Sequence, residues 1–156
     1  MKQNRWAIAV GTLLIVGAVV LGGCGGSGGS GSEGKRLTRA EFATKTDAIC
    51  SAYRKKAKTL GHPSGGAESV KVLGKVKVLF GEMVAAIKKL QPPADEQGTV
   101  DRALTISDEQ LGMLDQMIAA LERNDTAYLL KLVKKGDAMD KESNRVYHRL
   151  GVKACA

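Results

Sequence analysis

Aromatic residues are scarce in this sequence. Its 156 residues include one tryptophan, Trp6, with three tyrosines and two phenylalanines. A core built from the remaining hydrophobic side chains must therefore be mainly aliphatic. The scarcity also argues against one class of nucleic-acid binder, because proteins that bind single strands stack bases on aromatic side chains interleaved with basic ones. We expect no nucleic-acid partner.

Motifs for metal binding and catalysis are also lacking. His62 and His148 stand alone, without a second His or Cys at ligand spacing. No Glu-x-x-His element or C-x-x-C pair occurs, and the one G-x-S-x-G match, residues 25–29, belongs to a Gly/Ser-rich stretch rather than to a strand-to-helix turn. These observations argue against a di-iron site, a dithiol redox centre and a serine nucleophile. Residues 61–66 have the glycine spacing of a P-loop, but Ala67 and Glu68 follow where Lys and Ser or Thr are required. We expect no enzyme activity, no metal and no cofactor.

Methionine offers one alternative to that expectation. Met113 and Met117 lie one helical turn apart, and Met139 could join them from another helix. Thioether ligands select copper, but flexible Met side chains more often fill gaps in a core. We therefore interpret these residues as core.

Prolines and glycines interrupt long stretches with helical spacing. Thr38 and Glu41 form a capping-box pattern, and a helix is expected from there to Gly61. A turn over residues 62–66 leads into a second helix that ends at Pro92 and Pro93.

The rest of the chain has the same spacing. A third helix is expected over residues 94–123, and either Asn124 or Asp125 caps a fourth, which ends at Gly151. Four long helices with short connections predict an all-α, up-down-up-down four-helix bundle. The expected inner face of the third helix is made of Val100, Leu104, Leu111, Leu114, Ile118 and Leu121. The expected seam of the fourth is made of Leu129, Leu132, Gly136, Met139, Ser143, Val146 and Leu150.

The N-terminus carries a basic head and an apolar run, residues 6–20, which ends just before Leu-Gly-Gly-Cys24. This layout resembles the lipobox of bacterial lipoproteins, in which the cysteine thiol is joined to diacylglycerol and cleavage makes it the first residue. Residues 1–23 are thus expected to be a signal peptide, and Cys24 the lipidation site, with palmitate among its acyl groups. Residues 24–35 are expected to form a Gly/Ser-rich flexible linker, and residues 36–156 the bundle.

Lipidation of Cys24 has three alternatives. An ordinary secretory signal ends in an A-x-A-like site, which the sequence before Cys24 does not match. An uncleaved anchor needs about 20 apolar residues, and this run is shorter and contains Gly11 and Gly17. A cysteine that merely lies near a signal peptide is the third. We expect lipidation, with the protein on the extracytoplasmic face of the cell membrane.

The three cysteines fit that location. If Cys24 carries lipid, Cys50 and Cys155 remain as a pair in an oxidising compartment, and we predict that they form a disulfide. Cys50 lies about 18 Å along the first helix, whereas residues 152–155 can span only ~13 Å. Either the C-terminal tail folds back along the first helix, or the fourth helix ends early.

The net charge is positive. The chain has 24 basic and 16 acidic side chains, and removal of residues 1–23 leaves a net charge near +6. Basic residues cluster at Arg54, Lys55, Lys56 and Lys58 and recur at Lys131, Lys135, Arg145 and Arg149. Weak attraction to anionic lipid or to an acidic wall polymer is one hypothesis. A solvated basic face, interrupted by Asp137, Asp140 and Glu142, is the simpler one.

A family resemblance rests on three sequence features: Ile49-Cys50, the Leu-Gln-Pro-Pro stop over residues 90–93, and the closing Leu-Gly-Val-Lys-Ala-Cys-Ala over residues 150–156. With the lipobox, the chain resembles small, largely uncharacterised helical lipoproteins of actinobacteria and related Gram-positive bacteria. The resemblance implies an exported helical bundle with a Cys50–Cys155 link, and it implies no activity.

The expected function is therefore that of a membrane-anchored binding or scaffold module, whose protein partner and ligand the sequence does not identify. The alternative is a small-ligand carrier with a cavity near Gly112, Gly136 and Ser143. A well-formed apolar pocket of at least ~300 Å³ would favour the carrier. A solid core with an exposed apolar patch on one helix pair would favour a protein partner. A cleft that converges on His148 with carboxylates would favour an enzyme.

Overall fold

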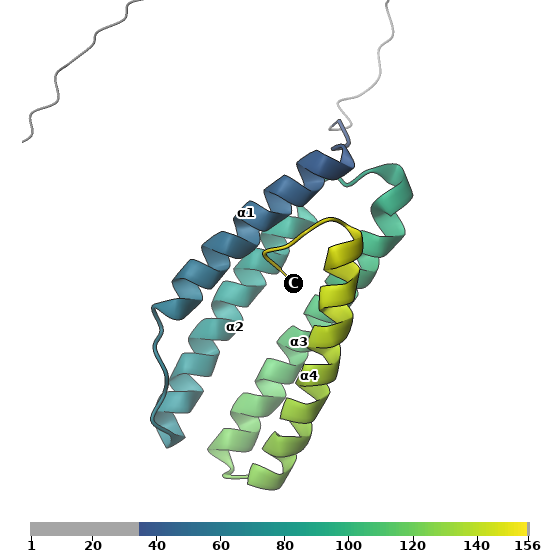
Figure 1. Cartoon of the computed structure of the whole chain (residues 1–156). Coiled ribbons are helices and arrows are strands. Elements are labelled where there is room, and N and C mark those ends of the chain that lie inside the picture. The colour runs from purple at the N-terminus through teal and green to yellow at the C-terminus, as the bar shows by residue number, and fades with distance from the viewer. Residues whose placement is uncertain (1–34, 156) are drawn as a thin grey trace, which may run out of the picture. The chain divides into compact units, whose positions relative to one another are not determined.

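The computed structural model describes residues 35–155, so the expected signal peptide, Cys24 and almost all of the expected linker lie outside the described part. Four long helices follow one another: α1 (Arg39–Lys58), α2 (Gly66–Lys88), α3 (Gln97–Glu122) and α4 (Thr126–Arg149). Figure 1 shows that each runs antiparallel to the next. The predicted all-α four-helix bundle is confirmed. Within residues 35–155, no helix combines the length and hydropathy that crossing a membrane requires.

The start of α1 follows the sequence prediction. The Thr38 hydroxyl oxygen accepts a hydrogen bond from the Glu41 backbone N–H at 3.3 Å, and the Glu41 carboxylate accepts one from the Thr38 backbone N–H at 2.8 Å. Both bonds of a capping box are therefore present. The hydrogen bonds to Thr38 lower the pKa of Glu41, because they stabilise its charged form.

Two helix boundaries differ from the prediction. Helix α1 ends at Lys58 rather than near Gly61, and Thr59 caps it with its backbone N–H and its hydroxyl group, both directed at the Lys56 carbonyl. The expected third helix is divided, because a 3-10 turn, η1 (Ala94–Glu96), precedes α3. A short 3-10 segment at a helix N-terminus is common and tightens its first turn.

The turn between α3 and α4 uses both candidate capping residues. Asn124 has φ 55° and ends α3, while the Asp125 N–H donates to the Ala120 carbonyl at 2.8 Å. The Asp125 carboxylate then accepts the Tyr128 N–H at 2.9 Å and caps α4. Asn tolerates the left-handed conformation better than most residues, so Asn124 ends α3 through its backbone and Asp125 begins α4 through its side chain.

Helix packing is sequential: α1 packs on α2, α2 on α3, and α3 on α4, with no comparable packing between α1 and α4 in the described part. The expected seam of α4 is confirmed, since all of its residues but the half-buried Leu129 are buried. On α3 the prediction was wrong in detail, because α3 packs on two neighbours and places small residues at the centre. Its buried residues are Val100, Ala103, Ile106, Ser107, Met113 and Ala120, whereas the predicted leucines and Ile118 are half-buried.

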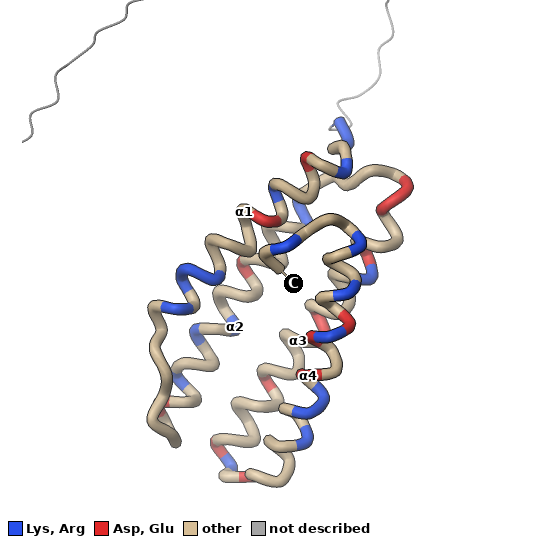
Figure 2. Tube along the Cα trace, in the orientation of Figure 1, with Lys and Arg blue, Asp and Glu red and all other residues tan. Residues whose placement is uncertain are grey.

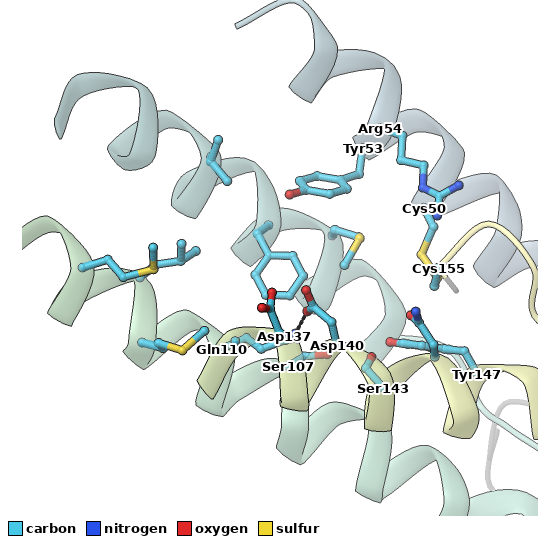
Figure 3. Close-up of a pocket in the computed structure, with 18 of the residues that line it drawn as sticks. Cys50, Tyr53, Arg54, Ser107, Gln110, Asp137, Asp140, Ser143, Tyr147 and Cys155 are labelled. Carbon is cyan, nitrogen blue, oxygen red and sulfur yellow. Dashed lines mark hydrogen bonds between the residues drawn. A yellow bond between two sulfur atoms is a disulfide. The ribbon is translucent and has the colours of Figure 1, made fainter. Parts of the chain in front are cut away.

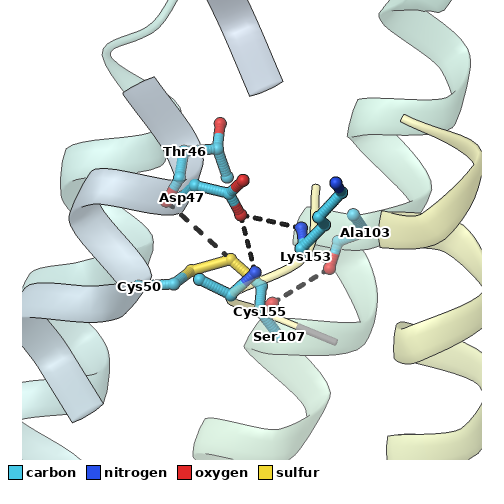
Figure 4. The surroundings of a disulfide bond; sticks show 8 residues. Thr46, Asp47, Cys50, Ala103, Ser107, Lys153 and Cys155 are labelled. Atoms are coloured by element: carbon cyan, nitrogen blue, oxygen red, sulfur yellow. Dashed lines mark hydrogen bonds between the residues drawn. A yellow bond between two sulfur atoms is a disulfide. The ribbon is translucent and has the colours of Figure 1, made fainter. Parts of the chain in front are cut away.

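The C-terminal tail joins α4 to α1. Gly151, at φ 77°, and Val152 close α4 with N–H bonds of 3.0 Å to the His148 and Tyr147 carbonyls, a Schellman motif. Val152 is then fully buried, and the Asp47 carboxylate accepts the N–H groups of Lys153 at 2.7 Å and Ala154 at 2.6 Å. Figure 4 shows these bonds beside the disulfide. The tail therefore folds back onto α1, which was one of the two predicted solutions.

The Cys50–Cys155 disulfide is confirmed. The two Cα atoms lie 5.4 Å apart and are separated by 105 residues in the sequence. Cys50 is buried and Cys155 is half-buried against the core. The bond fastens the tail to the middle of α1. It thereby links α4 to α1, two helices that do not pack closely on each other in the described part.

We predict that the double variant Cys50→Ala, Cys155→Ala has a lower free energy of unfolding, by up to ~4.7 kcal/mol, because the cross-link closes a very long loop in the unfolded chain. Urea unfolding followed by circular dichroism measures the difference. Reductant should lower the midpoint of the wild-type chain and leave that of the double variant in place. An unchanged wild-type midpoint would contradict the prediction.

Candidate functional site

A cleft of about 410 Å³ lies where α1 and α4 fail to pack, and all four helices and the tail contribute to its walls. Its apolar floor comes mainly from α2 and α3. The hydrophobic lining residues are Val76, Phe80, Met83, Met113, Leu114, Met117, Leu132 and Val133. Figure 3 shows the cleft with the disulfide at one end of it.

Polar side chains gather on one part of this wall. Asp137 and Asp140 lie one turn apart on α4, and the Asp140 carboxylate accepts a hydrogen bond from the Gln110 amide of α3 at 2.6 Å. Tyr53 faces them from α1, where it packs its ring 5.8 Å from that of Phe80. The cleft thus combines an apolar floor with a polar and acidic rim.

The charge of Asp140 is unfavourable in this setting. Burial raises the pKa of Asp140, repulsion by Asp137 raises it further, and the Gln110 hydrogen bond only partly offsets this. Burial also raises the pKa of Tyr53, and the nearby Asp140 charge adds to that effect. The pKa of Asp140 is higher in the folded protein than in the unfolded chain, so protonated Asp140 stabilises the fold. This contribution to the free energy of unfolding is lost as pH rises through the raised pKa.

Tyr147 supplies a polar atom without a partner. Its side chain is 3% exposed, and its hydroxyl group has no hydrogen-bond partner among the described residues. Burial raises the pKa of Tyr147, and an interaction of its hydroxyl with the Ser107 side chain, which lies outside normal hydrogen-bond geometry, lowers it. The Ser107 hydroxyl itself donates to the Ala103 carbonyl at 3.0 Å. Figure 3 shows the Tyr147 hydroxyl directed toward Ser107 and the cleft interior. An unpaired buried hydroxyl is destabilising, so this atom is well placed to receive a ligand.

Small residues shape the α4 wall. Gly136 and Ser143 line the cleft as expected, but Gly112 does not, because it lies exposed on α3 with no atom within 4 Å of the position its Cβ would occupy. A Cβ at Gly136 would instead lie 3.0 Å from the Met113 methyl carbon. The absence of a side chain at Gly136 therefore leaves room for Met113 beside the cleft.

The other residues singled out in the sequence are dispersed. Cys50 and Cys155 form part of the cleft wall, and Met113 and Met117 line it, but Met139 does not. His62 and His148 are both exposed and outside the cleft. Within residues 35–155, no group of three or more His, Cys, Asp or Glu side chains is arranged to hold a metal ion.

The basic residues singled out in the sequence are all exposed. Figure 2 shows a run of them late in α1 and others spaced along α4. The α1 run is Arg54, Lys55, Lys56 and Lys58, and the α4 set is Lys131, Lys135, Arg145 and Arg149. Only Arg54 among these eight also lines the cleft.

Sequence reasoning missed the polar rim. In the sequence, Asp137 and Asp140 only interrupt a basic face, Tyr53 belongs to the apolar spacing of the first helix, and Tyr147 is one of few aromatic residues. One signal could have found them: Asp137, Asp140 and Tyr147 directly follow the seam residues Gly136, Met139 and Val146, so they border the inner stripe of α4.

No family model, curated protein or solved structure matches this chain.

We predict that Tyr147→Phe raises the free energy of unfolding by about 1 kcal/mol, because it removes a buried hydroxyl group that has no partner. Thr46→Val is a matched variant: Thr46 is fully buried, its hydroxyl is also unpartnered, and it does not line the cleft. Urea unfolding of the full chain should show both variants to be more stable. A clear loss of stability in Tyr147→Phe would show that its hydroxyl is already satisfied.

Proposed function

We propose that this protein is a lipoprotein on the extracytoplasmic face of the cell membrane that binds an amphiphilic small molecule in its side cleft. One observation carries the binding function: an apolar cleft of about 410 Å³ contains a buried tyrosine hydroxyl without a partner. Pockets for small molecules are commonly about 300–1,000 Å³, with an apolar lining and a few polar groups that orient the ligand. This cleft has the same division, because its floor is apolar and its rim carries the polar groups.

The cleft favours a ligand carrier over the scaffold that the sequence first suggested. The large hydrophobic side chains that are most exposed, Val78 and Leu130, lie on different helices, and Val133 belongs to the cleft itself. A scaffold would instead be supported by a continuous apolar patch on one helix pair. Because neither histidine lines the cleft, we assign binding rather than catalysis to it.

Membrane attachment rests on the sequence around Cys24, which resembles a lipobox and is followed by a Gly/Ser-rich stretch. Such a stretch would let the bundle move freely near the membrane. The exposed basic residues of α1 and α4 would add weak attraction to anionic lipid or wall polymer, which salt would screen.

We predict that Cys24→Ala moves the protein from the membrane fraction to the soluble fraction or leaves it as unprocessed precursor, because the lipid acceptor is lost. Immunoblotting of fractionated cells measures the distribution, and mass spectrometry of the wild-type N-terminal peptide tests for the acyl groups. Any attachment of the variant that 1 M salt removes would be due to the basic faces. A wild-type protein cleaved without acylation would contradict the anchor.

We predict that Gly136→Ala weakens ligand binding while the protein stays folded, because the new Cβ pushes the Met113 methyl group toward the cleft. Gly112→Ala is the matched control: it gains the same helix propensity, about 1 kcal/mol, without touching the cleft. Titration with 4-phenylbutanol, a neutral amphiphile, would compare the variants. Equal binding by wild type and Gly136→Ala would show that the probe binds elsewhere.

A further inference from the structure

Acidic side chains outnumber basic ones in the lining of the cleft. Its charged lining residues are Asp137, Asp140 and Arg54. Figure 3 shows that Arg54, on α1, is directed toward the disulfide end, whereas the two aspartates of α4 lie together beside Gln110. No basic side chain lines the cleft next to the aspartates, so this part of it is negative.

The aspartates repel each other at the edge of an apolar space. A carboxylate near a second carboxylate, partly removed from water, is stabilised by a positive charge placed between them. The Gln110 amide supplies only one neutral hydrogen bond, at 2.6 Å, to one of the four carboxylate oxygens. A bound cation would relieve a repulsion that the protein alone leaves in place.

Tyr147 gives a second, independent indication. Asp140, Ser143 and Tyr147 follow one another on α4 at spacings of three and four, so they share one face of the helix. The buried Tyr147 hydroxyl is unpartnered, and its oxygen can accept a hydrogen bond. A hydroxyl group also donates, so Tyr147 marks a place for a polar ligand group, and the two aspartates decide the sign of its charge.

We propose that the ligand of the cleft is an organic cation, with an ammonium or guanidinium group held by Asp137 and Asp140 and an apolar body on the methionine-rich floor. This inference rests on the proposed binding function and specifies its ligand class. A bare metal ion fits less well, because a hard cation such as Ca²⁺ takes six to eight oxygen ligands and gains nothing from the apolar floor. Tyr53 and Phe80 add aromatic rings to the cleft wall, and aromatic faces attract organic cations.

Three probes that share one apolar body test the proposal: 4-phenylbutylammonium, 4-phenylbutanol and 4-phenylbutanoate. The full chain is studied in zwitterionic nanodiscs, with empty nanodiscs as the blank, and its methionine methyl groups are labelled for NMR. Met83, Met113 and Met117 line the cleft, whereas Met139 is buried outside it and serves as an internal reference.

We expect the ammonium probe to shift the three cleft methyl signals, to leave Met139 unchanged, and to bind about ten- to a hundred-fold more tightly than the alcohol. Asp140→Asn should remove that advantage and leave alcohol binding intact, whereas Asp108→Asn, the same charge change outside the cleft, should preserve it. Binding of the cation should strengthen as pH rises through the raised pKa of Asp140, because a proton competes with the cation.

The outcomes separate this inference from the function on which it rests. Equal binding of the ammonium and the alcohol, or a preference for the carboxylate, would overturn the cationic ligand and leave the carrier function standing. A preference that survives Asp137→Asn combined with Asp140→Asn would likewise overturn it. If no probe shifts the cleft methyl signals, both the cationic ligand and the carrier function are wrong.

Discussion

The docking of the C-terminal tail on α1 is the contact on which the rest of the molecule depends. Three interactions make it: burial of Val152, two backbone N–H bonds to the Asp47 carboxylate, and the Cys50–Cys155 disulfide. In an ordinary four-helix bundle the first and last helices pack along their whole length. Here the tail joins α4 to the first half and the middle of α1, and beyond Cys50 the two helices have no comparable packing in the described part.

That lack of packing explains where the core and the cleft lie. The buried residues of α1 and α2 are near the tail: Phe42, Thr46 and Cys50 on α1, and Met83, Val84 and Ile87 on α2. Farther along, the half-buried side chains of α2 and α3 face a space instead of a fourth helix. The polar rim is energetically unfavourable, because the charge of Asp140 and the hydroxyl of Tyr147 are both poorly satisfied by the protein. Unfavourable groups of this kind are typical of binding sites.

The sequence predicted the helices better than the cleft. Local signals, such as the Thr38–Glu41 capping box and Gly151, depend on neighbouring residues and were found where expected. The disulfide followed from counting cysteines, given a lipid on Cys24. The lack of packing between α1 and α4 could not be predicted, because it depends on how far a six-residue tail reaches once Val152 is buried. The roles of Asp140 and Tyr147 depend on that opening.

Because the tail forms part of the cleft wall, the cleft is completed by residues that follow all four helices in the chain. Every other lining residue precedes Ala154 and Cys155 in the chain, so a shortened protein could form most of the helices yet lack one end of the cleft. The wall also needs an oxidant, since Cys50 and Cys155 must lose two electrons to join. Both the presence of the tail and the redox state of the chain's surroundings thus decide whether the cleft is complete. Under reducing conditions the chain would form its helices but would lack the disulfide that completes the cleft wall.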